Sequence, residues 1–283
     1  MPFPEEQLEL VNKVVCSRTE WLDPLFIFLN YFDSAYFIFI LIPFIWIGFS
    51  YRLGLKLFYI IALSGFVNVC LKNLFGWPRP THDCPDIGLF DFHSYGFPSG
   101  GAQTAALLGT LLIYYWKSKW RFLVGGIYIL LVSFSRIYLG AHYPLDVLGG
   151  WVLGFLLAFL FICYQEKIEK YLTKKGLNFC LALNTAVALF FLWLIPTGQI
   201  QFQMGSLLAI GLGAYFSFKY DLCLKAPKTI TAGTSRGTLA VAILFLLYFL
   251  WPKEAPLFTQ TFVIGLWVSL LASPVCNYLK IKA

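Results

Sequence analysis

Residues 135–164 read SRIYLGAHYPLDVLGGWVLGFLLAFLFICY and join a polar turn to a long apolar run. The polar part carries a cation, a histidine and a carboxylate, which are Arg136, His142 and Asp146. The apolar part fits a span over 145–164, because about 17–25 such residues cross a bilayer as a helix. The stretch therefore predicts a membrane-spanning helix with ionisable groups at one end.

The composition extends this interpretation to the whole chain. Of its 283 residues, 59% are apolar and 12% are charged, whereas soluble proteins carry about 25% charged residues. Apolar runs predict about nine spans, near 25–50, 54–71, 102–118, 121–139, 145–164, 178–195, 203–218, 237–252 and 257–277. We expect an all-α, polytopic transmembrane helix bundle, preceded by an amphipathic helix at the membrane surface within 4–20.

The net charge of +7 follows this topology. Fifteen of the 21 basic residues fall in the loops after the first, third, fifth and seventh spans and at the C-terminus. The positive-inside rule places that face in the cytoplasm of a plasma (inner) membrane, with the C-terminus. The charge thus indicates orientation in the bilayer and no nucleic-acid partner. The seven cysteines have no CxxC spacing, so neither a disulfide framework nor a metal site is expected.

Three of the remaining basic residues gather on the opposite, external face. Lys72 and Arg79 flank NLFGWP at the end of the second span, and Arg136 ends the fourth. Clustered ionisable groups at a membrane face indicate a functional site. Three cations beside the glycine-containing loop 97–101 favour a multiply charged anion, most naturally phosphate.

The loop itself, FPSGG, has the features of an anion-binding turn. Ser99 is a good N-cap for the apolar helix that follows. The free N–H groups of Gly100 and Gly101 would then point outward from a helix N-terminus, where phosphate is stabilised. Because both glycines lack a Cβ, the anion can approach closely.

His142 is followed four residues later by Asp146, and Pro144 between them suits a first helical position. A carboxylate placed there can hold one imidazole nitrogen and leave the other free, as in nucleophilic catalysis. Beside a phosphate site, such a histidine can attack phosphorus and form a phosphohistidine. The nearby cations would neutralise charge without a metal.

These residues together resemble the type 2 phosphatidic acid phosphatase superfamily, which also contains the vanadium-dependent haloperoxidases. Its motif Lys-x6-Arg-Pro matches Lys72, Arg79 and Pro80; Pro-Ser-Gly-His matches Pro98, Ser99 and Gly100; Ser-Arg-x5-His-x3-Asp matches Ser135, Arg136, His142 and Asp146. The resemblance covers roughly residues 5–165. We therefore expect a catalytic helical bundle over 1–165 and additional transmembrane helices of unknown role over 166–283.

The resemblance implies an integral membrane lipid phosphatase that works at the external face without a metal or cofactor. By the same resemblance, His142 attacks the phosphate and Asp146 orients it. The phosphate-binding residues it implies are Lys72, Arg79, Arg136, Ser99, Gly100 and Gly101. The expected partners are a lipid substrate and the bilayer, and no oligomeric state is predicted.

Gly101 departs from the family pattern, in which a histidine at this position protonates the leaving group. A general acid contributes about 10²–10⁴-fold. Another group could supply the proton: His93, His82, or Gln103 through a water. Alternatively, the substrate is a polyprenyl diphosphate such as the undecaprenyl carrier, whose leaving group needs little acid catalysis. A phosphatidate-like monoester is the second choice of substrate. The chain could also be an impaired binder of lipid phosphates, or a phosphotransferase that uses another acceptor.

Overall fold

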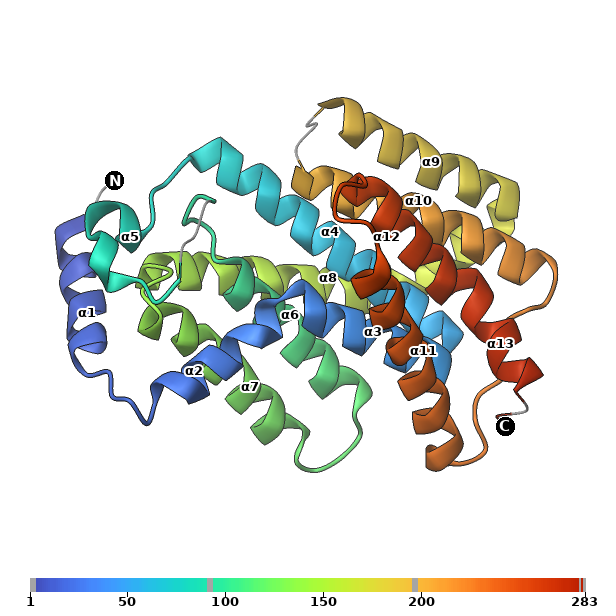
Figure 1. Ribbon diagram of the computed structural model, residues 1–283, viewed down its shortest axis with the longest axis horizontal. Helices are drawn as coiled ribbons and strands as arrows, with labels where there is room; N and C mark the ends of the chain where they lie inside the picture. Colours follow the sequence, from blue (N-terminus) through green and yellow to red (C-terminus); the bar gives the residue numbers. More distant parts are fainter. Residues whose placement is uncertain (1–3, 91–93, 195–197, 280, 282–283) are drawn as a thin grey trace. The chain divides into compact units, whose positions relative to one another are not determined.

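The computed structural model describes residues 4–90, 94–194, 198–279 and 281, and every regular element in these ranges is a helix (Figure 1). The predicted all-α architecture is confirmed. Contacts divide the chain into two compact units, one of Met1–Phe37 with Leu63–Tyr164 and one of Ile38–Ala62 with Gln165–Ala283. The expected functional division at residue 165 stays a prediction.

The first unit contains the helices that carry the predicted site. It includes α1 (Pro4–Cys16), α2 (Asp23–Asn30), η1 (Tyr31–Asp33), the start of α3 (Ala35–Gly48), the later part of α4 (Tyr51–Phe75), α5 (Pro80–Asp83), η2 (Pro85–Ile87), α6 (Gly100–Tyr115), α7 (Arg121–Tyr138) and most of α8 (Pro144–Lys175). The helices α4, α6, α7 and α8 each begin or end beside one of the predicted motifs.

The second unit contains the rest of α3, α4 and α8 and the C-terminal helices. These are α9 (Leu177–Leu194), α10 (Gly198–Lys219), α11 (Ile230–Leu250), α12 (Leu257–Leu266), the π-helical turn η3 (Trp267–Leu271) and α13 (Ala272–Tyr278). Glycines allow close helix packing here. A Cβ on Gly205 of α10 would lie 2.5 Å from the Phe258 carbonyl oxygen of α12.

Six helical stretches in the described ranges are long and apolar enough to cross a membrane. They are Tyr51–Asp83, Arg121–Tyr138, Pro144–Lys175, Leu177–Leu194, Ile230–Leu250 and Leu257–Tyr278, and a shorter apolar helix covers Tyr36–Gly48. A polytopic membrane protein is therefore confirmed, but the count of about nine spans is not. The helix α6 has only 16 residues, and α10 begins with three glutamines within 199–203.

The span expected near 25–50, whose polar start is predicted to lie in the membrane interface, is not one continuous helix. The chain forms α2, the 3-10 turn η1 and then α3, with an extended backbone at Ser34 between them. The Ser34 hydroxyl oxygen accepts a hydrogen bond from the Phe37 N–H at 3.3 Å and so caps the start of α3. The polar residues Asn30, Asp33 and Ser34 interrupt the apolar run, and serine favours a helix start over a helix interior.

The helix α1 is amphipathic, as predicted, and its apolar side contacts the protein itself. Val11 is fully buried and packs with Ile87 and Tyr143. On the opposite side, Glu9 and Lys13 form an exposed ion pair at 2.8 Å. The placement of α1 at a membrane surface stays a prediction.

Candidate active site

The loop FPSGG ends at the N-terminus of α6, as the sequence predicts. Ser99 has an extended backbone, and its hydroxyl oxygen accepts a weak hydrogen bond from the Ala102 N–H at 3.4 Å. The Ser99 N–H donates to the Asp146 carbonyl at 2.9 Å, which joins this loop to α8. Gly100 is the first residue of α6 and Gly101 is buried in its first turn. The first turn of α6 therefore lies next to the helix that carries Asp146.

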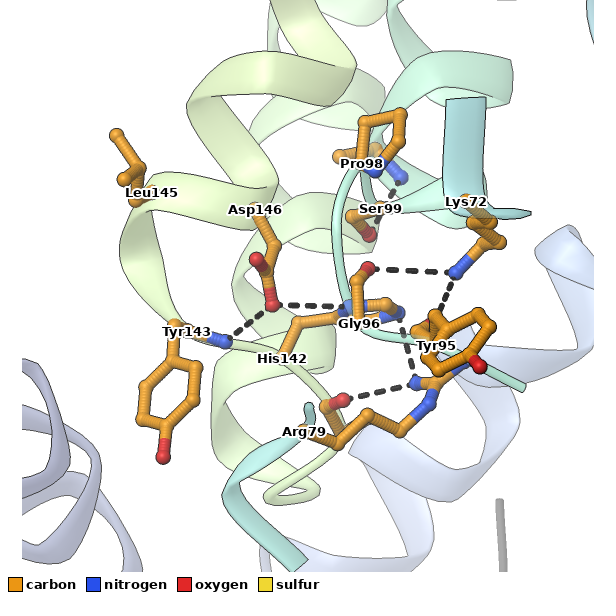
Figure 2. A network of polar contacts seen from close by, with 12 residues as sticks. Lys72, Arg79, Tyr95, Gly96, Pro98, Ser99, His142, Tyr143, Leu145 and Asp146 are labelled. Atoms are coloured by element: carbon orange, nitrogen blue, oxygen red, sulfur yellow. Dashed lines mark hydrogen bonds and ion pairs between the residues drawn. The ribbon is translucent and has the colours of Figure 1, made fainter. Parts of the chain in front are cut away.

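Lys72 reaches the same loop from the last turn of α4. Its ammonium group donates to the Tyr95 carbonyl and, at 3.3 Å, to the Gly96 carbonyl (Figure 2). The side chain is almost completely buried. A buried ammonium group is stabilised by an anion, so this position favours a negatively charged ligand beside residues 95–96.

Arg79, which precedes α5, connects two segments of the site. Its Nε and Nη2 donate to the Ser94 carbonyl and hydroxyl at 2.5 and 2.8 Å. Its Nη1 donates to the Ala141 carbonyl at 2.8 Å and lies 3.0 Å from His142 Nε2 (Figure 2). The guanidinium group thus joins the loop before Ser99 to the turn that carries His142.

His142 lies between Arg79 and Asp146, and all three side chains are buried. The distance from His142 Nδ1 to Asp146 Oδ2 is 3.4 Å, and the same oxygen accepts the Tyr143 N–H at 2.9 Å. A guanidinium group only donates, so His142 Nε2 must be the acceptor and the ring proton must be on Nδ1. This is the tautomer that a nucleophilic Nε2 needs.

The surroundings also keep the imidazole neutral. Burial, and then the charges of Arg79, Lys72 and Arg136, hold the pKa of His142 well below 6.5. Burial and neighbouring cations both disfavour the protonated form. The Nε2 lone pair is therefore present at neutral pH.

Arg136 lies in the last turn of α7 and is also buried. Its Nη1 donates a hydrogen bond to the Asn30 side-chain oxygen at the end of α2. Its charge acts on His142. The structure thus brings together all the predicted cations, the Ser99 turn, His142 and Asp146. Within the described ranges, no group of three or more His, Cys, Asp or Glu side chains could hold a metal ion.

Comparison with known proteins identifies the family. The PAP2 superfamily matches residues 53–170. The chain is 31% identical over 180 residues to phosphatidylglycerophosphatase B of Bacillus subtilis, which covers 59% of this chain and 87% of that protein. The chain belongs to the PAP2 superfamily. The resemblance read from the motifs is confirmed.

Other PAP2 proteins match shorter parts. The chain is 39% identical over 83 residues to undecaprenyl-diphosphatase of Sulfolobus acidocaldarius, covering 28% of this chain and only 40% of that protein. The crystal structure of Aquifex aeolicus LpxE aligns with a TM-score of 0.51 at 31% identity, over 56% of this chain and 94% of that one. The crystal structure of a PAP2 phosphatidylglycerolphosphate phosphatase from Bacillus subtilis aligns with a TM-score of 0.50 at 26% identity. The alignment covers 58% of this chain and 86% of that one. These relatives confirm the prediction of a membrane phosphatase.

The structure describes two of the three groups that could act as the acid in place of a histidine at position 101. The Gln103 amide is bonded on both sides: Nε2 donates to the Ser64 carbonyl and hydroxyl at 2.9 and 2.8 Å, and Oε1 accepts from Asn68 Nδ2 at 2.9 Å. Both ends of the Gln103 amide are therefore already hydrogen-bonded to α4. His82 is exposed, and its Nδ1 accepts the Arg79 backbone N–H at 3.3 Å. His93 lies outside the described residues.

Three residues of this PAP2 site escaped the sequence analysis: Asn30, Asn68 and Ser94. Asn68 donates to the Pro98 carbonyl at 3.2 Å and so supports the loop 97–101 from α4. Its signal was available, because it lies one helical turn before Lys72 in an apolar helix. Asn30 and Ser94 gave no such signal, since their partners Arg136 and Arg79 are distant in sequence.

Proposed function

We propose that this PAP2 chain removes phosphate from a lipid diphosphate or monophosphate at the external membrane face, through a phosphohistidine on His142. One observation carries the proposal. His142 is held between Asp146 at Nδ1 and Arg79 at Nε2, and its Nε2 lone pair accepts from the Arg79 cation. A phosphate bound to that cation would lie within reach of the nucleophile.

The first step begins when the lipid phosphate binds. Its oxygens take the place of neutral partners around Lys72, Arg79 and the amides of Gly100 and Gly101. Arg79 Nη1 then donates to a phosphate oxygen and releases the His142 lone pair. A bond forms between Nε2 and phosphorus while the bond from phosphorus to the leaving oxygen breaks. The Nδ1 proton stays on the ring, and Asp146 stabilises the resulting positive charge.

In the second step, a water oxygen attacks phosphorus and the P–N bond breaks. The electron pair returns to Nε2, inorganic phosphate leaves and one water proton passes to the solvent. Binding and charge neutralisation by Lys72, Arg79 and Arg136 serve both steps. Hydrolysis therefore restores neutral His142 for the next cycle.

A polyprenyl diphosphate is the substrate that Gly101 favours. The leaving group of a diphosphate is a lipid phosphate, which departs as an anion without a proton. A monoester releases an alkoxide, which needs the acid that Gly101 lacks. The similarity to an undecaprenyl-diphosphatase supports the diphosphate, while phosphatidylglycerophosphatase B supports a monoester as second choice.

The direction of the site across the membrane follows from the basic loops. Five basic residues lie at the helix ends opposite to the site: Lys117 and Lys119 after α6, Arg121 at the start of α7, and Lys174 and Lys175 at the end of α8. The positive-inside rule assigns these loops to the cytoplasm. The site then faces outward from the inner membrane, and the C-terminus is cytoplasmic.

The test is to trap the intermediate. Purified full-length protein is mixed with a polyprenyl diphosphate labelled on its terminal phosphate, or with labelled phosphatidate, in the presence of a chelator. We expect acid-labile label on His142 and release of inorganic phosphate. The variant His142→Ala should lose the label and at least roughly 10³-fold of the turnover. The control Asn12→Leu, at an exposed position of α1, should keep both.

Two results would contradict the proposal: label retained in His142→Ala, or no label and no phosphate release from either lipid. Label that moves to a second lipid without release of inorganic phosphate would instead identify a phosphotransferase. The assay therefore follows the labelled protein, inorganic phosphate and the lipid products separately.

A further inference from the structure

The N-terminal segment lies outside the part of the chain that matches the PAP2 superfamily, which begins at residue 53. In the first unit, this segment nevertheless contacts both helices that flank the His142 turn. These are α7, which carries Arg136 in its last turn, and α8, which carries Asp146 in its first turn. Each contact is made at a helix end.

Arg18, between α1 and α2, binds the end of α7. Its Nε and Nη2 donate to the Tyr138 carbonyl at 2.8 and 2.5 Å, and its Nη2 also donates to the Ile87 carbonyl at 2.8 Å. Tyr138 is the last residue of α7. The last carbonyls of a helix lack intrahelical donors, and a cation there is favoured by the helix dipole. Arg18 is thus a C-terminal cap supplied from a distant segment.

Gln7, in α1, makes the corresponding contact at the start of α8. Its side-chain oxygen accepts the Leu145 N–H at 3.0 Å. Leu145 is the second residue of α8, and the first N–H groups of a helix have no intrahelical partner. An oxygen acceptor at this place stabilises a helix start in the way that an N-cap does. The residue that follows is Asp146.

The third contact reaches a proposed phosphate-binding residue directly. The Asn30 side-chain oxygen accepts a hydrogen bond from Arg136 Nη1. The start of α2 is also tied to α7, because the Tyr138 hydroxyl donates to Asp23 at 2.6 Å and Phe26 stacks on Tyr138 with ring centroids 4.0 Å apart. The α2 helix therefore holds the last turn of α7 at both of its own ends.

We propose that residues 7–30 are a positioning element for the reaction: Arg18 and Gln7 cap the two helix ends on either side of the His142 turn, and Asn30 directs Arg136. The inference rests on the proposed function. Its physical reason is the steep dependence of catalysis on geometry, since a displacement of about 1 Å can cost about 10²-fold. None of the three residues needs to touch the substrate.

The test compares variants that remove a contact with variants that keep it. In the full-length protein, Gln7→Leu and Asn30→Leu remove the acceptor at nearly constant volume, while Gln7→Glu and Asn30→Asp retain it. Asn12→Leu, at an exposed position of α1, is the matched control. The readouts are kcat, KM, the rate of phosphohistidine formation on a labelled polyprenyl diphosphate, and the unfolding temperature.

We expect both leucine variants to lower kcat and the rate of labelling by about 10- to 100-fold. The loss of one hydrogen bond should lower the unfolding temperature only slightly, so that both variants are still folded at the assay temperature. The retaining variants and Asn12→Leu should stay close to the unsubstituted protein. If the leucine variants do not fold, Arg18→Lys decides. Lysine keeps the charge but cannot bridge the Tyr138 and Ile87 carbonyls in the same way, so kcat should fall while KM changes less.

His142→Ala separates the two proposals. Suppose that His142→Ala abolishes labelling, but the folded leucine variants keep normal kcat and labelling. The positioning role is then wrong and the proposed function stands. If the leucine variants do not fold, the same conclusion follows from a folded Arg18→Lys with normal kcat and labelling. If His142→Ala keeps labelling and turnover, the proposed function is wrong and the positioning inference is overturned with it.

Discussion

At the scale of single residues, the surroundings of His142 set its chemistry. The ring is buried, accepts from Arg79 at Nε2 and faces Asp146 at Nδ1. These contacts select one tautomer and oppose protonation, because every close cation repels the imidazolium form. An oriented, neutral histidine is suited to attack on phosphorus, whereas a structural histidine needs neither property.

The lowered pKa of His142 predicts a loss of stability in acid. In the unfolded chain, His142 takes up a proton near pH 6.5. In the folded chain, it does so only at a lower pH. Between these two pKa values the free energy of unfolding therefore rises with pH, and it falls as the pH drops below 6.5. We expect His142→Gln to lose less unfolding temperature between pH 7.5 and 5.5 than the unsubstituted protein. Thermal unfolding in detergent measures this, with His82→Gln as control; equal losses in His142→Gln and the unsubstituted protein would refute it.

Gly101 leads to a second prediction at this scale. Gly101→His places an acid in the first turn of α6, at the position where the resemblance to the family implies one. We expect a gain of up to about 10²-fold in kcat on a monoester and a smaller gain on a diphosphate, because only the monoester releases an alkoxide. Gly101→Gln controls for side-chain bulk. Equal gains on the two substrates would exclude the leaving-group explanation.

At the scale of elements, α4 and α6 are joined by a buried polar chain beneath the phosphate loop. Asn68 donates to both the Pro98 carbonyl and Gln103, and Gln103 donates to Ser64. All three side chains are buried. Buried polar groups are costly when unpaired, so the hydrogen bonds among Asn68, Gln103 and Ser64 specify one alignment of α4 and α6.

We therefore predict that Gln103→Leu destabilises the fold by about 1–3 kcal/mol, because it leaves polar groups of Asn68 and Ser64 without their partner. Thr110→Val is the control in the same helix: it removes only a local hydrogen bond to the Ala106 carbonyl. Denaturant unfolding compares the two. If Gln103→Leu lowers the free energy of unfolding no more than Thr110→Val does, the buried hydrogen bonds of Gln103 do not hold α4 to α6.

At the scale of the whole molecule, the number of membrane crossings depends on α6. Its 16 residues extend about 24 Å at 1.5 Å per residue, and the hydrocarbon core is about 30 Å thick. The flanking Trp116 and Lys117 can extend the crossing, because aromatic rings and lysine side chains reach into the interface. The proposed topology requires α6 to cross.

Cysteine labelling tests this crossing. In a variant without the seven native cysteines, single cysteines replace Asp86 in η2 and Lys119 between α6 and α7. A membrane-impermeant maleimide added to intact cells should label position 86 at once and position 119 only after permeabilisation. Labelling of both from outside would show that α6 does not cross, and labelling of 119 alone would invert the proposed orientation.

The sequence by itself determined the membrane class, the helical architecture and the family, and it predicts the residues of the proposed site. These follow from local information: run length, residue type and short spacings such as the four residues from His142 to Asp146. The polar residues Asn30, Asp33 and Ser34 are visible within 25–50, but the sequence did not show that the backbone leaves the helix at Ser34.

Only the tertiary structure decided which groups meet. Arg79 and His142 are 63 residues apart, Asn30 and Arg136 are 106 apart, and Gln7 and Leu145 are 138 apart. Such pairs depend on how helices pack, which is set by many contacts summed over the first unit and not by any local pattern. The tautomer of His142, the support of the loop 97–101 and the caps on either side of the His142 turn all belong to that level.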